Sequence, residues 1–310
     1  MTGVEIAVQM SGHVTLLFLK IHFNVIMKKL YSFCQICVLF LPLVANAWNS
    51  IGHKVIADIA WDQLTPVVKQ NLRHDIALFA RRYHQYPSLG GMAVWPDRLI
   101  GQDDHRYDTW HYIDIPLGET WRAQDPSKAP NVVWAIEQAK QVMADPKTKP
   151  AKRVKYEAFL VHFVGDLHQP LHCAEWYSAQ FPQGDRGGNA FMIHADHAKN
   201  LHTFWDHGVG YFAKFSRHYP PSGKQIRKIA THIEQQYPRE RLQTDLKDKD
   251  VMHWAAASHQ LAKSVAYPGI HINQTIKKHS AYVQKGQAIV EKQLALAGYR
   301  LGDLLNHLII

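Results

Sequence analysis

The chain has 310 residues, of which 46% are apolar and 20% are charged, which is the composition of a folded globular protein. These values exclude an intrinsically disordered chain, a collagen-like repeat and a polytopic membrane protein. The formal net charge of +9 favours acidic partners such as phosphates, and the 21 histidines exceed what surface positions alone explain.

The first 47 residues have the pattern of a leader that is removed. Two consecutive lysines precede a short uncharged apolar run, which ends in Ala45-Asn46-Ala47. This order is typical of a signal peptide, and the run is shorter than the ~20 residues that a membrane anchor needs. We therefore expect residues 1–47 to be an N-terminal extension and signal peptide, the signal spanning 27–47, with Met27 as an alternative initiator. Residues 48–310 are expected to form a single catalytic domain.

The rest of the chain predicts an all-α, multi-helix domain. Apolar residues recur at helical spacing from Ile51 to Leu64, and Thr65-Pro66 is typical of an N-cap followed by a first-turn proline. Two long polar stretches, about 84–130 and 173–197, are expected to be active-site loops, because long loops within a domain usually carry function. No alternating strand pattern is present. Helices are expected at 51–64, 66–82, 131–144, 152–168, 198–216, 224–236, 250–266 and 274–297.

The segment from Phe159 to His172 carries the strongest chemical signal. His162 and Asp166 are four residues apart, so on a helix they lie on one face and can reach a common ion. Pro170 ends that helix and allows His172 to point to a neighbouring position. His168 lies six residues from His162 and is expected on a different face, as a packed histidine or a support to the site.

Three further segments repeat these residue types. His202 and Asp206 form a second pair at helical spacing, while Asp97 and the run from His111 to Asp114 lie in the first long loop. A single pair of this kind is as readily a simple hydrogen-bonded pair, but the combination favours a metal. Imidazole and carboxylate ligands without thiolates suit a catalytic zinc site.

The ordered motifs W-x-x-x-G-H, W-x-D, W-H-Y-I-D, H-F-x-G-D-x-H-Q-P-L-H, G-G-N and N-L-H-x-x-W-D run from Trp48 to about residue 210. In this combination the sequence resembles the zinc-dependent S1/P1 nuclease family, whose members are single-strand nucleases with 3′-nucleotidase activity and are related in fold to bacterial zinc phospholipase C. The resemblance implies an all-α domain with three zinc ions.

The resemblance also implies which residues hold each ion. The first ion would take the α-amine and carbonyl of Trp48, with His53 and Asp166. The second would take Asp97, His111, His162 and the other oxygen of Asp166, and the third His172, His202 and Asp206. An α-amine at Trp48 exists only after cleavage behind Ala47, so removal of the leader and formation of the site would be one event.

The remaining predicted roles concern the substrate. Three zinc ions and three aspartates leave roughly +3 in one cleft, which favours an anionic phosphate. By resemblance, Asp114 orients the attacking water, Asn189 contacts the substrate and Tyr112 stacks on a base; Arg98 is a candidate phosphate contact, although the usual basic position is occupied by Ile100. Base stacking explains a preference for single strands, because bases inside a duplex expose no free face.

The sequence thus predicts an endonuclease that hydrolyses RNA and single-stranded DNA to 5′-nucleotides, and 3′-nucleotides to nucleosides. The alternatives are a zinc phospholipase C and a non-catalytic zinc-binding protein. Only Cys173 remains after residue 47, so no internal disulfide is expected. With the leader, this absence indicates a periplasmic or secreted protein of bacterial origin, with no stable protein partner and no membrane span after cleavage.

Overall fold

The first helices begin where the sequence supplies caps. The computed structural model describes residues 48–123, 125–127, 130–215 and 221–309; the predicted signal peptide lies outside them. Helix α2 (Ser50–Gln63) follows Asn49, whose side chain accepts hydrogen bonds from the backbone at the helix start. Helix α3 (Pro66–Tyr83) is capped by Thr65 with a first-turn proline, as predicted.

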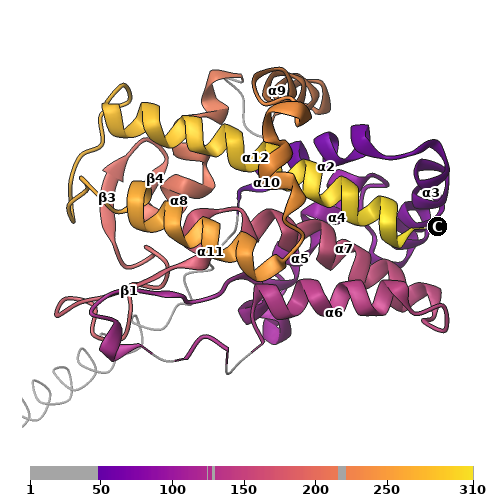
Figure 1. The fold of residues 1–310 in the computed structure, drawn as a ribbon, viewed down its shortest axis with the longest axis horizontal. Helices are drawn as coiled ribbons and strands as arrows, with labels where there is room; N and C mark the ends of the chain where they lie inside the picture. The colour runs from indigo at the N-terminus through magenta and orange to yellow at the C-terminus, as the bar shows by residue number, and fades with distance from the viewer. Residues whose placement is uncertain (1–47, 124, 128–129, 216–220, 310) are drawn as a thin grey trace, which may run out of the picture. The chain divides into compact units, whose positions relative to one another are not determined.

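The described part of the chain is predominantly helical, which confirms the all-α fold class (Figure 1). The other α-helices are α4 (Leu89–Ala93), α5 (Trp95–Ile100), α6 (Val132–Ala144), α7 (Pro150–Leu167), α8 (Leu201–Asp206), α9 (Gly223–Gln236), α10 (Gln243–Lys247), α11 (Val251–Leu261) and α12 (Ala281–Leu308). Short 3-10 or π segments are η2 (His105–His111), η3 (Thr120–Arg122), η4 (Pro170–Cys173), η5 (Gly208–Gly210), η6 (Phe212–Lys214), η7 (Arg239–Leu242) and η8 (Ala262–Ala266).

The stretch 84–130, which was predicted to be a loop, also contains α4, α5 and η2, so that prediction is wrong in part. Two small ladders lie in or beside the two predicted loops, although no strand was predicted. Strand β1 (Pro116–Gly118) pairs in parallel with β2 (Glu175–Tyr177), and Pro116 lies opposite Glu175. Strand β3 (Met192–Ala195) pairs antiparallel with β4 (Ala198–Asn200). Ladders of three or four residues are too short to produce the alternation by which strands are recognised in a sequence.

The predicted helix at 198–216 is wrong in extent. Only Leu201–Asp206 is α-helical, preceded by β4 and followed by two 3-10 turns. Asn200 caps the helix, and positive φ angles at Gly208, Val209 and Gly210 end it. The last helix is also displaced: α12 starts at Ala281 behind the cap Ser280, later than the predicted residue 274.

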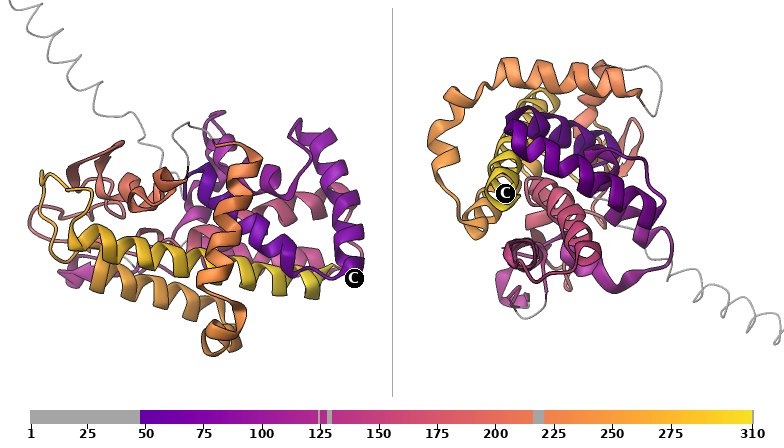
Figure 2. Two further views of the ribbon diagram at one scale, coloured as in Figure 1. Left: turned by 90° about the horizontal axis from the view of Figure 1, so that it is seen from above. Right: turned by 90° about the vertical axis from the view of Figure 1, so that its right-hand side faces the viewer.

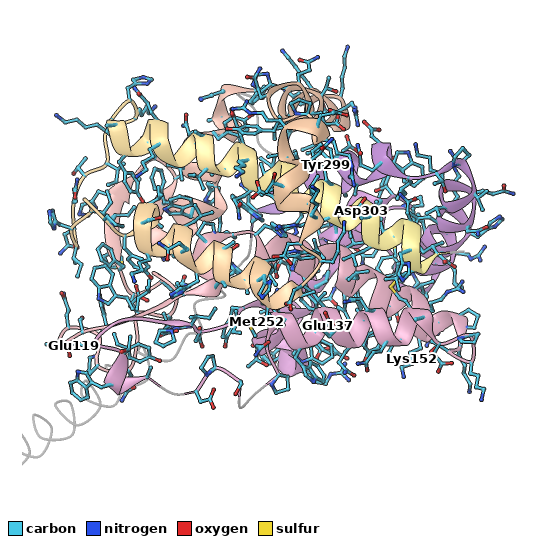
Figure 3. The ribbon with its side chains drawn as sticks, in the orientation of Figure 1. Glu119, Glu137, Lys152, Met252, Tyr299 and Asp303 are labelled. Atoms are coloured by element: carbon cyan, nitrogen blue, oxygen red, sulfur yellow. The ribbon has the colours of Figure 1, made fainter. Side chains whose placement is uncertain are left out.

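The longest helix, α12, packs along α2 and also contacts α7 and α9 (Figure 2). Gly298 permits this approach, because a Cβ there would lie 2.5 Å from the Ile59 side chain. Tyr299 and Asp303 lie in the C-terminal half of α12 (Figure 3); the Tyr299 side chain is buried and Asp303 is half-buried. The Tyr299 hydroxyl donates to the Tyr237 carbonyl, and Asp303 accepts from Arg239 at 2.6 Å. One cluster of buried apolar side chains extends from Trp48 to Ile309.

Within the described residues, no helix combines the length and the apolar character that crossing a membrane requires.

Candidate metal centre

Helix α7 carries the centre of the site. His162 and Asp166 are buried one turn apart on it, and Pro170 turns the chain into η4, which carries the buried His172. This is the local geometry that a four-residue spacing and a helix-breaking proline dictate. Helix α2 brings His53 against His162, with the two rings stacked at 4.0 Å between centroids.

The two oxygens of Asp166 face different partners. Oδ1 lies 3.2 Å from Nε2 of His53, whereas Oδ2 lies 3.0 Å from Nδ1 of His111 and 3.2 Å from Nε2 of His162. Asp97, on α5, points Oδ1 to within 3.4 Å of Nε2 of His162. These five side chains come from four separate segments, and their ligand atoms form two overlapping triplets suited to metal binding.

A third triplet lies where η4 meets α8. Nε2 of His172 is 3.8 Å from Oδ1 of Asp206, and Nε2 of His202 is 3.5 Å from Oδ2 of the same carboxylate. Gln169 fixes that carboxylate by donating to Oδ1 at 2.7 Å. The structure therefore brings together every side chain that the sequence assigned to the three ions.

Backbone carbonyls fix the orientation of three of the histidines. In each, Nδ1 donates to a carbonyl oxygen, which can only accept, so Nε2 is the nitrogen that faces the cluster and can bind a metal when the ring is neutral. The pairs are His162 with Ala93 at 2.6 Å, His172 with His111 at 2.8 Å and His202 with Gly187 at 2.7 Å. Such support is what histidine ligands need to hold a metal.

Several buried atoms of the clusters lack a hydrogen-bond partner among the described residues. They include both ring nitrogens of His53, Nε2 of His111 and of His172, and Oδ1 of Asp97 and of Asp166. Unpaired polar atoms cost free energy when buried, and here they converge on common points. Metal ions would satisfy them, so the donor set fits zinc ions bound by imidazole and carboxylate.

The charges in the cluster are strongly coupled. Burial opposes the charged form of each group, but the carboxylates of Asp166 and Asp97 raise the pKa of His162 to about 10. In return, although burial acts against it, the charge of His162 lowers the pKa of Asp166 and Asp97. Burial lowers the pKa of His172 and raises that of Asp206.

Gly165 is required by the site. A Cβ at this position would lie 2.8 Å from Nδ1 of His53, so a side chain would displace that ring. The glycine of the G-D pair in α7 therefore gives the α2 histidine its place beside His162.

Trp48 is buried immediately before the N-cap of α2. The next residue, Asn49, donates its backbone N–H to the carbonyl of Asp206 at 3.0 Å. The start of α2 is thereby tied to α8, which carries part of the third triplet. Chelation by the Trp48 amine and carbonyl remains a prediction.

A cavity of about 270 Å³ is lined by Tyr112, Asp114 and Glu175, among others, which follow the cluster residues His111 and His172 by one to three positions. Asp114 and Glu175 share a side-chain hydrogen bond, so this carboxyl pair holds a proton. Burial and the charge of Asp114 raise the pKa of Glu175 to about 9. Glu175 also accepts from the backbone N–H of Arg186 at 2.9 Å.

Sequence reasoning missed Glu175. The available signal was spacing: Asp114 follows His111 by three residues, and Glu175 follows His172 by three. The parallel β1–β2 ladder then brings the carboxyls of Asp114 and Glu175 together, which no local sequence pattern predicts.

The remaining candidates lie at the margin of the site. Asn189 is buried after the Gly187-Gly188 turn and donates to the Arg186 carbonyl at 2.9 Å. Arg98 is exposed and donates to the Gln85 amide oxygen at 2.5 Å. Cys173 is a buried free thiol that donates to the Leu167 carbonyl.

His168 stays outside the clusters, as expected from its spacing. Its Nδ1 donates to the Val164 carbonyl at 2.7 Å, and its Nε2 lies 2.8 Å from a guanidinium nitrogen of Arg300. Both ring nitrogens are therefore occupied.

A helical protein with three buried His/Asp clusters, formed in part by residues of α2, α7 and α8, has the features of a metal-dependent enzyme. The sequence profile of the S1/P1 nuclease family matches residues 48–309. The chain belongs to this family and is a hydrolase acting on phosphodiester bonds.

Its relatives include Endonuclease 2 of Arabidopsis thaliana, 25% identical over 280 residues, which cover 85% of this chain and 91% of the relative. Nuclease S1 of Aspergillus oryzae is 23% identical over 284 residues, covering 86% and 94%. Nuclease P1 of Penicillium citrinum is 23% identical over 282 residues, covering 84% and 97%.

These relatives correct the expected localisation. A periplasmic or secreted protein of bacterial origin was predicted, but the relatives come from plants and fungi, and the prediction is wrong in that respect. The reason is physical: a lack of disulfides reports how a chain is stabilised and not which organism makes it.

Proposed function

We propose that the protein is a zinc-dependent endonuclease that hydrolyses RNA and single-stranded DNA to 5′-nucleotides and also removes phosphate from 3′-nucleotides. The observation that carries the proposal is the set of nine predicted ligand residues, whose eight His and Asp side chains converge in three buried clusters within the S1/P1 nuclease family match. Residues 48–310 would be the catalytic domain, and residues 1–47 would be removed with a signal peptide.

The first ion would be held by Trp48, His53 and Asp166, the second by Asp97, His111, His162 and Asp166, and the third by His172, His202 and Asp206. When bound, the ions would lower the pKa of a bound water to near neutral. They would also supply positive charge that stabilises the phosphoryl and leaving oxygens. The separation of the two Asp166 oxygens supports a bridging role for this carboxylate.

The chain's own groups would position the substrate and the water. Asp114 accepts a hydrogen bond from the attacking water, and Glu175 holds Asp114 in place through the shared proton. Asn189 directs its amide to the phosphate, and Tyr112 offers its ring to a base in the 270 Å³ cavity. Arg98 is a candidate phosphate contact once it releases Gln85.

Elemental analysis of the mature protein tests the metal assignment. Mass spectrometry should place the N-terminus at Trp48, and about three zinc ions per chain are expected. Protein that retains Ala47 should bind less zinc and be inactive, because the amide of a continuing chain cannot chelate as a free amine does. Full activity behind a retained N-terminal tag would contradict the role of Trp48.

The substrate class is tested by comparing hydrolysis of single-stranded DNA, RNA and phosphatidylcholine. Nucleolysis is expected. Lipid turnover without nucleolysis would identify a phospholipase C instead, and zinc binding without either activity would indicate a zinc-binding protein.

A further inference from the structure

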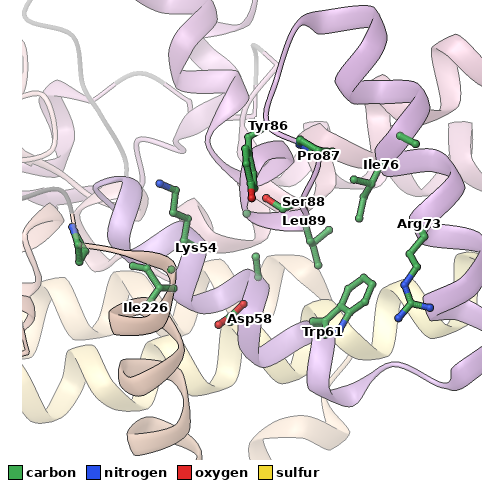
Figure 4. A pocket seen from close by; sticks show the side chains of 15 residues that line it. Lys54, Asp58, Trp61, Arg73, Ile76, Tyr86, Pro87, Ser88, Leu89 and Ile226 are labelled. Atoms are coloured by element: carbon green, nitrogen blue, oxygen red, sulfur yellow. The ribbon is translucent and has the colours of Figure 1, made fainter.

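A second and larger cavity lies against the face of α2 that adjoins the face carrying His53. It encloses about 680 Å³ between α2, α3, the segment leading into α4 and the start of α9 (Figure 4). This volume falls in the range of ordinary small-molecule sites. We name it the α2–α3 pocket; its walls include Lys54, Trp61, Ile76, Tyr86, Leu89 and Ile226.

Two positively charged residues, Lys54 in the pocket wall and Arg98 near it, each follow a predicted metal ligand in the sequence. Lys54 follows His53 on α2, so the two side chains diverge by about 100° and face the pocket and the metals respectively. Arg98 likewise follows Asp97.

These two cations are not neutralised locally. Among the described residues, Lys54 has no carboxylate within ion-pair distance, and Arg98 is hydrogen bonded to the neutral amide of Gln85. Asp58 lines the same pocket, but it lies 3.8 Å from Arg227, and the Lys54 amine points away from it (Figure 4). A half-buried cation beside a second cation is a site that an anion would stabilise.

The rest of the pocket suits a flat apolar group. Trp61 lies against Arg73, whose guanidinium is 5.5 Å from the indole centroid, and Ile76 and Leu89 line the same cavity. At the rim, Tyr86 is 76% exposed, which is unusual for a large aromatic side chain. A phosphate alone would leave the apolar and aromatic surfaces without a contact, and an apolar ligand would leave the Lys54 charge without a partner. A nucleotide has a phosphate for Lys54 and a base for the apolar wall.

We propose that the α2–α3 pocket is a second nucleotide subsite, which binds a neighbouring nucleotide of the strand that the metal centre cleaves. Lys54 and Arg98 contact its phosphate, and its base stacks on Tyr86 against the apolar wall. The consecutive pairs His53-Lys54 and Asp97-Arg98 place the two sites on adjoining faces of the same elements, so one strand can pass between them. This inference rests on the proposed nuclease function.

Substrate length provides the kinetic test. Lys54→Gln and Tyr86→Ala are compared with the control Lys285→Gln, which changes an exposed lysine on α12. For each protein, kcat/KM is measured on a single-stranded DNA dodecamer and on a 3′-mononucleotide that is too short to fill both sites. The ratio of the two values should fall about tenfold in each pocket variant, chiefly through KM on the dodecamer, and stay at the wild-type value in the control.

Binding separates the two roles and does not depend on turnover. The probe is a fluorescent dodecamer with phosphorothioate linkages, followed by anisotropy over a range of salt concentrations. Lys54→Gln should reduce the slope of log K against log salt by about 0.7, because one phosphate contact is lost. Tyr86→Ala should weaken binding about tenfold and leave that slope unchanged.

Wild-type length ratios and wild-type dodecamer binding in both pocket variants would overturn the subsite. If the wild-type protein hydrolyses no nucleic acid, the proposed function fails, and the anisotropy comparison still decides whether the pocket binds a strand.

Discussion

Two groups of buried polar residues meet at the end of α7, and they differ in what their histidine rings contact. His162 and Asp166 face the metal centre, where buried nitrogens and oxygens lack partners among the described residues. His168, only two residues beyond Asp166, is equally buried but has both ring nitrogens occupied. Burial alone therefore does not mark a ligand; imidazole and carboxylate atoms that converge within reach of one ion do.

The His168 group is a structural contact between α7 and α12. Arg300 lies over the Trp254 ring at 4.6 Å and also donates to the Asp245 carbonyl. Burial and the neighbouring Arg300 charge lower the pKa of His168 to about 3, so the ring stays neutral and accepts from Arg300. Gln293 adds a bond to the His168 carbonyl at 2.9 Å. This group needs no ion.

The strongest test of the contrast is Asp166→Asn. The amide carries no charge to offer the two sites that Asp166 serves, so zinc content should fall below two ions per chain and activity by about 10³-fold or more. Elemental analysis and a nuclease assay measure both. Asp196→Asn, at an exposed position, is the control; normal zinc content in Asp166→Asn would remove the bridging role.

Asp114→Ala sharpens the contrast inside the site. It should leave zinc content near normal while kcat falls about 10²-fold, because a group that orients the attacking water is lost and no ligand is. Elemental analysis beside steady-state kinetics separates the two effects. Loss of zinc together with activity would instead make Asp114 a structural support of the centre.

Arg300→Met tests the His168 group. Nε2 of His168 would lose its donor, and the free energy of unfolding should fall by about 1–3 kcal/mol, while zinc content and kcat/KM stay at wild-type values. Chemical denaturation measures the stability. Arg239→Met, which breaks a surface ion pair with Asp303, should cost at most about 1 kcal/mol. A loss of zinc in Arg300→Met would show that the two groups are not independent.

Glu157, buried on α7, gives the smallest expected effect and a defined pH dependence. Burial and the Asp75 charge raise its pKa well above the ordinary value. Its folded pKa exceeds its unfolded pKa, so its contribution to stability is complete at pH 4 and is lost as pH rises. Between pH 5 and 6 the wild type should lose about 1 kcal/mol relative to Glu157→Gln. Parallel stability curves for the two proteins would contradict this pKa.

Local rules predicted the elements whose signals are local. Thr65-Pro66 begins α3 as expected, and the four-residue spacing places His162 and Asp166 on one face of α7. The prediction of one helix over 198–216 was wrong, because its apolar residues have helical spacing but positive φ angles at Gly208 and Gly210 end the helix early. A three-residue ladder such as β1–β2 gives no sequence signal at all.

The sequence by itself determined which side chains can bind a metal and which of them share a helix face, because residue type and helical period are local properties. The structure shows Asp166 dividing its oxygens between His53 and the His111–His162 pair, as the family resemblance implied, but only the tertiary structure decided that Glu175 meets Asp114. It also decided that Arg300 occupies His168. These side-chain contacts join residues up to 132 positions apart. Such contacts are set only when the helices have packed, so a local sequence pattern does not predict them.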